Sequence, residues 1–202
     1  MVLPGLNVSR ETEAELRRLV ELVVKWTVHI NLVSSSSIGD IWNRHILDSA
    51  QLFNYLPAAA NHWVDLGSGG GFPGLVVGVI AKELAPGLRL TLVESDQRKA
   101  TFLRSAVREL NLSIDVQTTR IEFTNPLCAD ILSARALGPL TQLLGHAQLH
   151  LSTTGIGLFP KGKTANQEIE VARRNWHFDL TAHASMTDEY AQILRIEKIL
   201  HV

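Results

Sequence analysis

The N-terminal part of the chain carries apolar residues at helical spacing. Across residues 10–30 they recur every three or four positions, which predicts an amphipathic helix that Ser9 is placed to cap. Residues 38–56 repeat the pattern, and Pro57 is expected to end this second helix. We therefore predict that residues 1–60 form a helical extension.

The rest of the chain, residues 61–202, alternates short apolar runs with helical stretches. The runs predicted as strands are 62–66, 88–95, 112–119, 130–135 and 155–160, and the predicted helices are 73–84, 95–110, 138–151 and 164–175. This alternation is typical of βαβ units on a mostly parallel sheet with helices on both faces. The tail, 177–186 and 190–200, predicts a closing antiparallel hairpin. We expect one globular core on which the extension packs.

Composition and charge narrow the class of protein. The chain has 202 residues, of which 46% are hydrophobic, enough for one domain with a substantial core. The net charge of -1 indicates no global attraction to nucleic acid. Cys128 is the single cysteine, which excludes an internal disulfide, and the scattered histidines match no metal motif. The sequence shows neither a leader nor a membrane-spanning run, so we expect a cytoplasmic protein without a metal.

A glycine-rich loop, "DLGSGGGFPG" at 65–74, follows the first predicted strand of the core. In open α/β sheets this turn is a favoured ligand site, and bare backbone leaves room for the ligand. Pro73 suits the first turn of the next helix, whose free N–H groups attract anionic groups. Glu94 ends the second strand, where a carboxylate can accept hydrogen bonds from ribose hydroxyls. An NAD dehydrogenase and a class I S-adenosylmethionine-dependent methyltransferase both use an acid there.

Two features favour S-adenosylmethionine over a dinucleotide. Asp65 precedes the glycines, where a carboxylate suits the ligand's amino group and repels a pyrophosphate. The second half of the chain also lacks an evident hydride-transfer set. An NAD-linked oxidoreductase remains the alternative.

Several segments, in order, resemble the RsmG (GidB) family of bacterial methyltransferases, which make 7-methylguanosine in 16S ribosomal RNA. The segments are "NLVSSSSIGDIWNRHILDS" (31–49), "VDLGSGGGFPG" (64–74), "LVESDQRKATFLR" (92–104), "TRIEF" (119–123), "ARALGPL" (134–140) and "PKGK" (160–163). The resemblance implies a class I fold, Rossmann-like, with a mostly parallel seven-stranded sheet and the small ribosomal subunit as partner. We expect a monomer.

The same resemblance implies a set of site residues. It places S-adenosylmethionine against Asp65, Gly67, Ser68, Gly69, Gly71, Phe72 and Gly74, its ribose on Glu94, and its adenine near Ser95, Ile121 and Glu122. It sets Arg135 beside the point of methyl transfer, Asn31, Arg44, His45, Asp48 and Ser49 over the same cleft, and Lys161 at the end of the fifth strand. Asn31, His45 and Arg135 are thus the candidates for positioning roles in catalysis.

The residues themselves leave alternatives open. Arg135 could contact the acceptor base or its sugar-phosphate, secure the carboxylate of S-adenosylmethionine, or form a salt bridge to Asp65 or Asp130. Helical spacing predicts an ion pair between Arg44 and Asp48 and leaves His45 either a packing or a functional residue.

Basic residues gather in two places that suit an RNA backbone. Arg98, Lys99, Arg104 and Arg108 follow Glu94, and Lys161, Lys163, Arg173 and Arg174 follow the fifth strand. Phosphate contacts would explain them as a group, whereas singly each fits a solvated helix face. Positions 134–139 depart from the family pattern, and the family's Arg-His pair before the last strand has no counterpart in 189–196. A protein that binds ribosomal RNA without turnover is therefore a further alternative.

Overall fold

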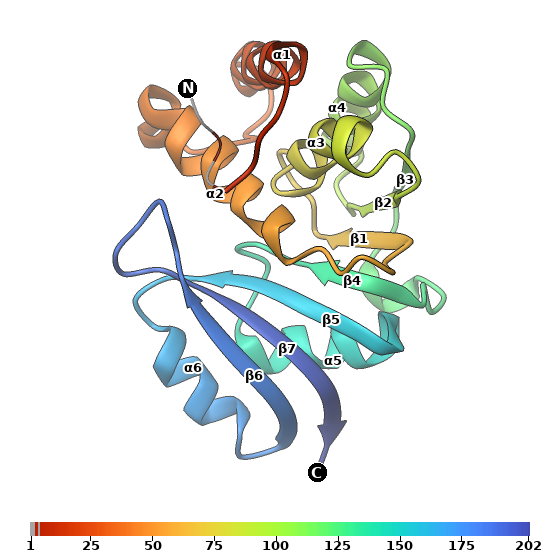
Figure 1. The fold of residues 1–202 in the computed structure, drawn as a ribbon, viewed down its shortest axis with the longest axis vertical. Coiled ribbons are helices and arrows are strands. Elements are labelled where there is room, and N and C mark those ends of the chain that lie inside the picture. The colour runs from red at the N-terminus through yellow and green to blue at the C-terminus, as the bar shows by residue number, and fades with distance from the viewer. Residues whose placement is uncertain (1–2, 4) are drawn as a thin grey trace.

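A seven-stranded sheet organises the computed structural model, which describes residue 3 and residues 5–202 (Figure 1). The strands are β1 (His62–Leu66), β2 (Arg89–Val93), β3 (Ile114–Gln117), β4 (Ala129–Ser133), β5 (Leu151–Lys161), β6 (Trp176–Ala184) and β7 (Gln192–His201). Their order is β3-β2-β1-β4-β5-β7-β6. The first five run parallel, and β7 is antiparallel to both β5 and β6. The predicted parallel sheet and closing hairpin are confirmed.

Helices cover both faces of this sheet. They are α1 (Arg10–Thr27), α2 (Asp48–Ala50), α3 (Gly74–Leu84), α4 (Gln97–Glu109), α5 (Leu140–His150) and α6 (Ala165–Ala172). The segments α1, α2, α3 and α4 lie on one side of the sheet in Figure 1, and α5 and α6 lie on the other. The chain therefore switches faces after β4, and the loops at the carboxyl ends of β1 and β4 diverge there.

The predicted helix over 38–56 is wrong in detail. Its helical winding changes from η1 (Ser35–Asp40, 3-10) to η2 (Trp42–Leu47, π), then α2, then η3 (Gln51–Tyr55, 3-10), and one further 3-10 turn, η4 (Ile121–Phe123), lies after β3. A serine side chain stabilises the 3-10 turn η1 at the start of this segment, because the Ser37 hydroxyl donates a hydrogen bond to the Ser34 carbonyl at 2.7 Å.

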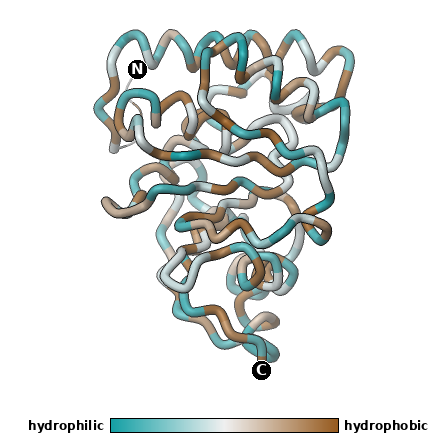
Figure 2. Tube along the Cα trace, turned by 90° about the vertical axis from the view of Figure 1, so that its right-hand side faces the viewer, coloured by the Kyte–Doolittle hydropathy of each residue, from teal (hydrophilic) through white to brown (hydrophobic). Residues whose placement is uncertain are grey.

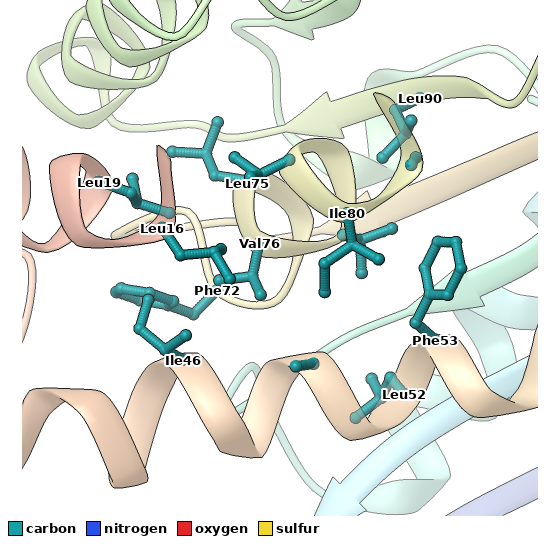
Figure 3. Packing of buried hydrophobic residues seen from close by; sticks show 14 of the residues in the cluster. Leu16, Leu19, Ile46, Leu52, Phe53, Phe72, Leu75, Val76, Ile80 and Leu90 are labelled. Atoms are coloured by element: carbon teal, nitrogen blue, oxygen red, sulfur yellow. The ribbon is translucent and has the colours of Figure 1, made fainter. Parts of the chain in front are cut away.

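Neighbouring residues of each central strand enter different cores. On β1, Trp63 belongs to the core beneath α1, α3 and α4, whereas Val64 belongs to the core beneath α5 and α6. The first core joins the extension to the sheet: Leu16 and Leu19 of α1 and Ile46 of η2 pack around α3 (Figure 3). In Figure 2, hydrophilic and hydrophobic bands follow one another along the helical trace at the top of the view. Burial of the apolar stripes therefore fixes the extension on the core.

Among the described residues, none of the helices has both the length and the apolar character that crossing a bilayer requires.

Candidate active site

The loop between β1 and α3 is built from backbone that few side chains would tolerate. Gly69 and Gly71 have φ of 54° and 87°, in the left-handed region. A Cβ on Gly71 would lie 2.3 Å from a methyl group of Leu75, whereas at Gly69 the nearest atom would be a backbone oxygen 3.7 Å away. Gly71 therefore packs the loop onto α3, and Gly69 faces open space.

Glu94 joins this loop to the end of β2. Its Oε2 accepts a hydrogen bond from the Gly69 N–H at 2.7 Å, and its Oε1 accepts one from the Asp96 N–H at 2.8 Å. The side chain is only 7% exposed. Because a charged acceptor strengthens each hydrogen bond, Glu94 fixes both the glycine loop and the chain that enters α4.

A cavity of about 320 Å³ lies against these groups, and we call it the glycine-loop cavity. Its lining residues are Gly67, Gly69, Val93, Glu94, Ser95, Lys99, Thr119, Arg120, Ile121, Glu122, Ala136, Leu137, Gln142 and His146. Six of the predicted cofactor residues are among them: Gly67, Gly69, Glu94, Ser95, Ile121 and Glu122. Four other predicted cofactor residues are buried and do not line the cavity: Ser68, Gly71, Phe72 and Gly74. Lys99, predicted as an RNA contact, borders this cavity.

Asp65 lies beneath the glycine loop and is only 1% exposed. Its Oδ1 accepts a hydrogen bond from the Ser133 hydroxyl at 2.7 Å, and its Oδ2 accepts one from the Gly74 N–H at 3.2 Å. Burial raises the pKa of Asp65 from 3.8 to about 6, although these hydrogen bonds oppose the shift. The Gly74 N–H at the start of α3 is therefore already bonded, in contrast to the prediction of free N–H groups, and Pro73 precedes the helix as its N-cap.

A second cavity, of about 790 Å³, adjoins the first at Ala136, and we call it the Arg135 cavity. Its lining residues are Asp40, Arg44, Asp48, Arg135, Ala136, Gly138, Pro160, Lys161, Gly162, Glu168, Thr187, Asp188, Glu189, Tyr190 and Ala191. They come from the helical extension, the segment after β4, the end of β5, α6 and the loop between β6 and β7. Segments far apart in the sequence thus enclose one hollow beside the glycine-loop cavity.

Arg135 is held from the side of the extension. Its Nη1 lies 3.0 Å from Asp48 Oδ2 in an ion pair, and its Nη2 lies 2.6 Å from His45 Nδ1. Of the alternatives that the sequence left open for Arg135, the salt bridge to Asp65 or Asp130 is not formed among the described residues, because the ion-pair partner is Asp48. Asp130 instead accepts the Asn61 and His62 N–H groups. The predicted pair of Arg44 with Asp48 is also absent from the ion pairs of residues 3 and 5–202.

His45 connects Arg135 to the glycine loop. Its ring packs on Phe72 with the ring centroids 4.8 Å apart. Burial, followed by the charges of Arg135 and Arg44, lowers the pKa of His45 to about 4. The imidazole is therefore neutral at pH 7, and its Nδ1 accepts the hydrogen bond from Arg135 while the proton resides on Nε2. That Nε2 is buried without a hydrogen-bond partner among the described residues.

Asp48 also braces the hairpin loop, residues 185–191, which reaches toward α2 in Figure 1. Its Oδ1 accepts hydrogen bonds from the Thr187 hydroxyl and the Gln51 side-chain amide, each at 2.9 Å. Gln51 Oε1 accepts the Met186 N–H at 2.9 Å. One carboxylate therefore joins the extension, Arg135 and the hairpin loop. Gln51 and Thr187 carry no local motif, so the sequence gives no sign of their role.

The predicted RNA-binding residues fall into two groups. Arg44 lines the Arg135 cavity, and Arg98 and Lys163 are exposed. Lys161 is different, because its ammonium donates to the Gly138 carbonyl at 2.7 Å and to Glu168 at 2.8 Å, with the side chain only 10% exposed. Lys161 therefore fixes the segment after β4 instead of presenting a free charge.

The remaining predicted residues of the extension lie outside both cavities. Asn31 borders a separate surface hollow together with Ile30 and Ser34. Ser49 is buried, and its hydroxyl has no hydrogen-bond partner among the described residues. Within residues 3 and 5–202, no group of three or more His, Cys, Asp or Glu side chains is arranged to hold a metal ion.

Comparisons with known proteins agree on the family and the fold. The family model described as rRNA small subunit methyltransferase G matches residues 12–196. A protein from Cereibacter sphaeroides named Ribosomal RNA small subunit methyltransferase G is 50% identical over 201 residues, covering 100% of this chain and 97% of its own. Its namesake from Ruegeria pomeroyi is 50% identical over 197 residues, covering 98% and 96%.

Solved structures resemble the chain in fold. A SAM-dependent methyltransferase from Aquifex aeolicus superimposes with a TM-score of 0.60 at 10% identity, covering 88% of this chain and 97% of its own. The mitomycin 7-O-methyltransferase MmcR gives a TM-score of 0.59 at 15% identity, covering 94% and 69%. The predicted class I methyltransferase fold is confirmed.

Proposed function

The chain belongs to the rRNA small subunit methyltransferase G family, and we propose that it transfers a methyl group from S-adenosylmethionine to small-subunit ribosomal RNA. The observation that carries this proposal is the pair of adjoining cavities that meet at Ala136, at the carboxyl edge of the sheet. A transferase needs room for a donor and an acceptor side by side, so that the reacting atoms can approach to about 3–3.5 Å.

The glycine-loop cavity fits the donor. Its volume of about 320 Å³ is at the lower end of the range for small-molecule sites. Glu94 offers a carboxylate to ribose hydroxyls, Ile121 and Leu137 offer apolar surface to an adenine, and Gly69 leaves the backbone open. We assign Asp65 the indirect role of holding the loop from beneath. When bound, S-adenosylmethionine supplies an electrophilic methyl group.

The Arg135 cavity fits the acceptor, and its residues position the base. We propose that the acceptor atom is N7 of a guanine in 16S ribosomal RNA. N7 carries a free lone pair and loses no proton when it is methylated, so this site requires no general base. The neutral His45 and the carboxylate of Asp48 hold the guanidinium of Arg135 in one orientation, from which it can donate hydrogen bonds to the base or its sugar-phosphate.

We propose phosphate contacts for Arg44, Arg98 and Lys163, whose side chains are exposed. Such contacts would make binding weaken as the salt concentration rises. We also propose that the active form is a monomer. A ribosomal RNA substrate in turn supports a cytoplasmic site of action.

Two measurements test this function. Calorimetry is expected to show binding of S-adenosylmethionine and S-adenosylhomocysteine but not of NADH. Labelled S-adenosylmethionine is expected to transfer its methyl group to small ribosomal subunits from a strain that lacks this activity, at a position that chemical cleavage specific for 7-methylguanosine identifies. Cofactor binding without incorporation would favour the non-catalytic alternative, and failure of both would refute the proposal.

A further inference from the structure

Tyr190 is the one aromatic residue among those that line the Arg135 cavity in the described part of the chain. We propose that its ring is the platform on which the acceptor base stacks, an inference that rests on the proposed function. The side chain is 56% exposed, and its phenol has no hydrogen-bond partner among residues 3 and 5–202. A large ring left open at the edge of a nucleotide-sized hollow offers the π-face that base recognition uses.

The hairpin loop holds the backbone of Tyr190 in place. Its N–H donates to Asp188 Oδ1 at 2.9 Å, and the Ala191 N–H donates to the Asp188 carbonyl at 3.1 Å. Gln51 and Asp48 brace the other side of the same loop at Met186 and Thr187, as described above. The ring is therefore carried on a turn that is fixed at both ends, so little conformational entropy is lost when a base stacks on it.

Lys163 restricts how a base can reach the ring. Its Nζ lies 4.3 Å from the centroid of Tyr190, so the ammonium covers one face. Lys163 does not line the Arg135 cavity, whereas Tyr190 does. We therefore place the base on the ring face that Lys163 leaves free.

The charge of the Arg135 cavity suits the product of the proposed reaction. Five carboxylates line it against three basic groups: Asp40, Asp48, Glu168, Asp188 and Glu189 against Arg44, Arg135 and Lys161. Methylation of guanine N7 leaves the base positively charged, and an electron-rich ring attracts a cation over its face. Tyr190 therefore stacks more strongly on the base as the methyl group arrives than before it, which favours the transition state.

The test compares Tyr190→Ala and Tyr190→Phe with the matched control Met186→Ala, an exposed residue of the same loop outside the cavity. Loss of one base–aromatic stack is expected to cost about tenfold in affinity, or about 1.4 kcal/mol. With small ribosomal subunits as substrate, we expect Tyr190→Ala to lower kcat/KM about tenfold, with part of the loss in kcat because the stack strengthens in the transition state. Tyr190→Phe and Met186→Ala are expected to stay within about twofold of the wild type, and affinity for S-adenosylhomocysteine to be unchanged in all three.

Two outcomes would overturn this role: Tyr190→Ala within twofold of the wild type, or Tyr190→Phe as impaired as Tyr190→Ala, which would assign the effect to the hydroxyl. If the wild type itself transfers no methyl group, the proposed function fails. Filter binding of small subunits to the S-adenosylhomocysteine-loaded proteins then still decides whether the ring of Tyr190 contributes to binding.

Discussion

The two cavities of this protein are assembled in different ways. The glycine-loop cavity takes its shape from backbone turns at the ends of neighbouring parallel strands, and Glu94 joins two of those turns through main-chain N–H groups. The Arg135 cavity takes its shape from segments far apart in the sequence, which side chains hold together through Asp48. The first is thus set by the topology of the sheet, and the second depends on a few polar contacts.

This difference separates binding of the donor from positioning of the acceptor. Changes at Glu94 are expected to impair the glycine-loop cavity without loosening the hairpin loop, because the carboxylate accepts hydrogen bonds from the β1–α3 and β2–α4 turns. Changes at Asp48 are expected to loosen the hairpin loop without impairing the glycine-loop cavity. The partners of Asp48, which are Arg135, Gln51 and Thr187, lie outside that cavity.

Removal of the Glu94 carboxylate is expected to have the largest effect. Glu94→Ala removes the carboxylate that we propose accepts hydrogen bonds from the ribose hydroxyls, and it leaves the N–H groups of Gly69 and Asp96 without their charged acceptor. A hydrogen bond to a charged group contributes about 1.5–3 kcal/mol. We expect the affinity for S-adenosylmethionine, measured by calorimetry, to fall at least about 100-fold. Glu170→Ala serves as the control, because this carboxylate is exposed on α6 and lines neither cavity. A dissociation constant within threefold of the wild type in Glu94→Ala would contradict the assignment.

Stability should depend on pH through the carboxylate beneath the glycine loop. Because the pKa of Asp65 is raised from 3.8 to about 6 in the folded state, the protonated form stabilises the fold below pH 3.8, and this contribution is lost as pH rises through 6. The shift corresponds to about 3 kcal/mol in the free energy of unfolding. Relative to Asp65→Asn, the wild type is therefore expected to lose stability between pH 4.5 and 7.

The comparison with Asp65→Asn is needed because His45 acts in the opposite direction. Its pKa is lowered to about 4, so the unfolded chain takes up a proton below pH 6.5 that the folded chain does not, and stability falls on acidification. Urea unfolding of both proteins from pH 4.5 to 7.5 separates the two contributions, since His45 is common to both. A difference between them that stays constant over this range would refute the raised pKa of Asp65.

The contacts of Asp48 test the independence of the second cavity. Asp48→Asn removes the negative charge that faces the guanidinium of Arg135 but keeps an acceptor for Thr187. We expect kcat/KM for small ribosomal subunits to fall about 10- to 100-fold. This fall corresponds to about 1.4–2.8 kcal/mol of interaction free energy lost from the pair of Asp48 and Arg135. Asp40→Asn is the matched control in the same cavity. A parallel loss of affinity for S-adenosylmethionine in Asp48→Asn would show that the cavities are coupled.

The same difference explains what could be predicted from the sequence. Every strand of the parallel sheet and the closing hairpin were predicted, because apolar runs and their spacing record burial directly. Of the residues that line the glycine-loop cavity, the glycines and Glu94 were predicted from their place at strand ends, where topology brings them together, whereas Ser95, Ile121 and Glu122 were implied by the family resemblance. The winding of residues 35–55 was not predicted, since its 3-10, π and α segments are each only three to six residues long, too short for an apolar period to distinguish them.

The contacts around Arg135 could not be predicted for a physical reason. Helical spacing paired Asp48 with Arg44, yet Asp48 bonds across the fold to Arg135 and Thr187. Lys161 was predicted as a free basic group, yet Gly138 and Glu168 occupy its ammonium. In each case a tertiary partner, which no local pattern specifies, replaced the neighbour in sequence.

Asn31 provides the smallest expected effect and tests the boundary of the site. The family resemblance placed it over the cleft, whereas the structure places it, exposed, in a surface hollow apart from both cavities. Surface substitutions away from specific contacts usually change stability by less than about 0.5 kcal/mol. Asn31→Ala is therefore expected to leave both kcat/KM for small subunits and the affinity for S-adenosylmethionine within about twofold of the wild type. The segment next to Asn31 already lies against the glycine loop, because a Cβ on Gly70 would lie 2.8 Å from the carbonyl oxygen of Leu32. A tenfold loss of activity with unchanged cofactor affinity would therefore mean that this segment moves when RNA binds and brings Asn31 to the acceptor.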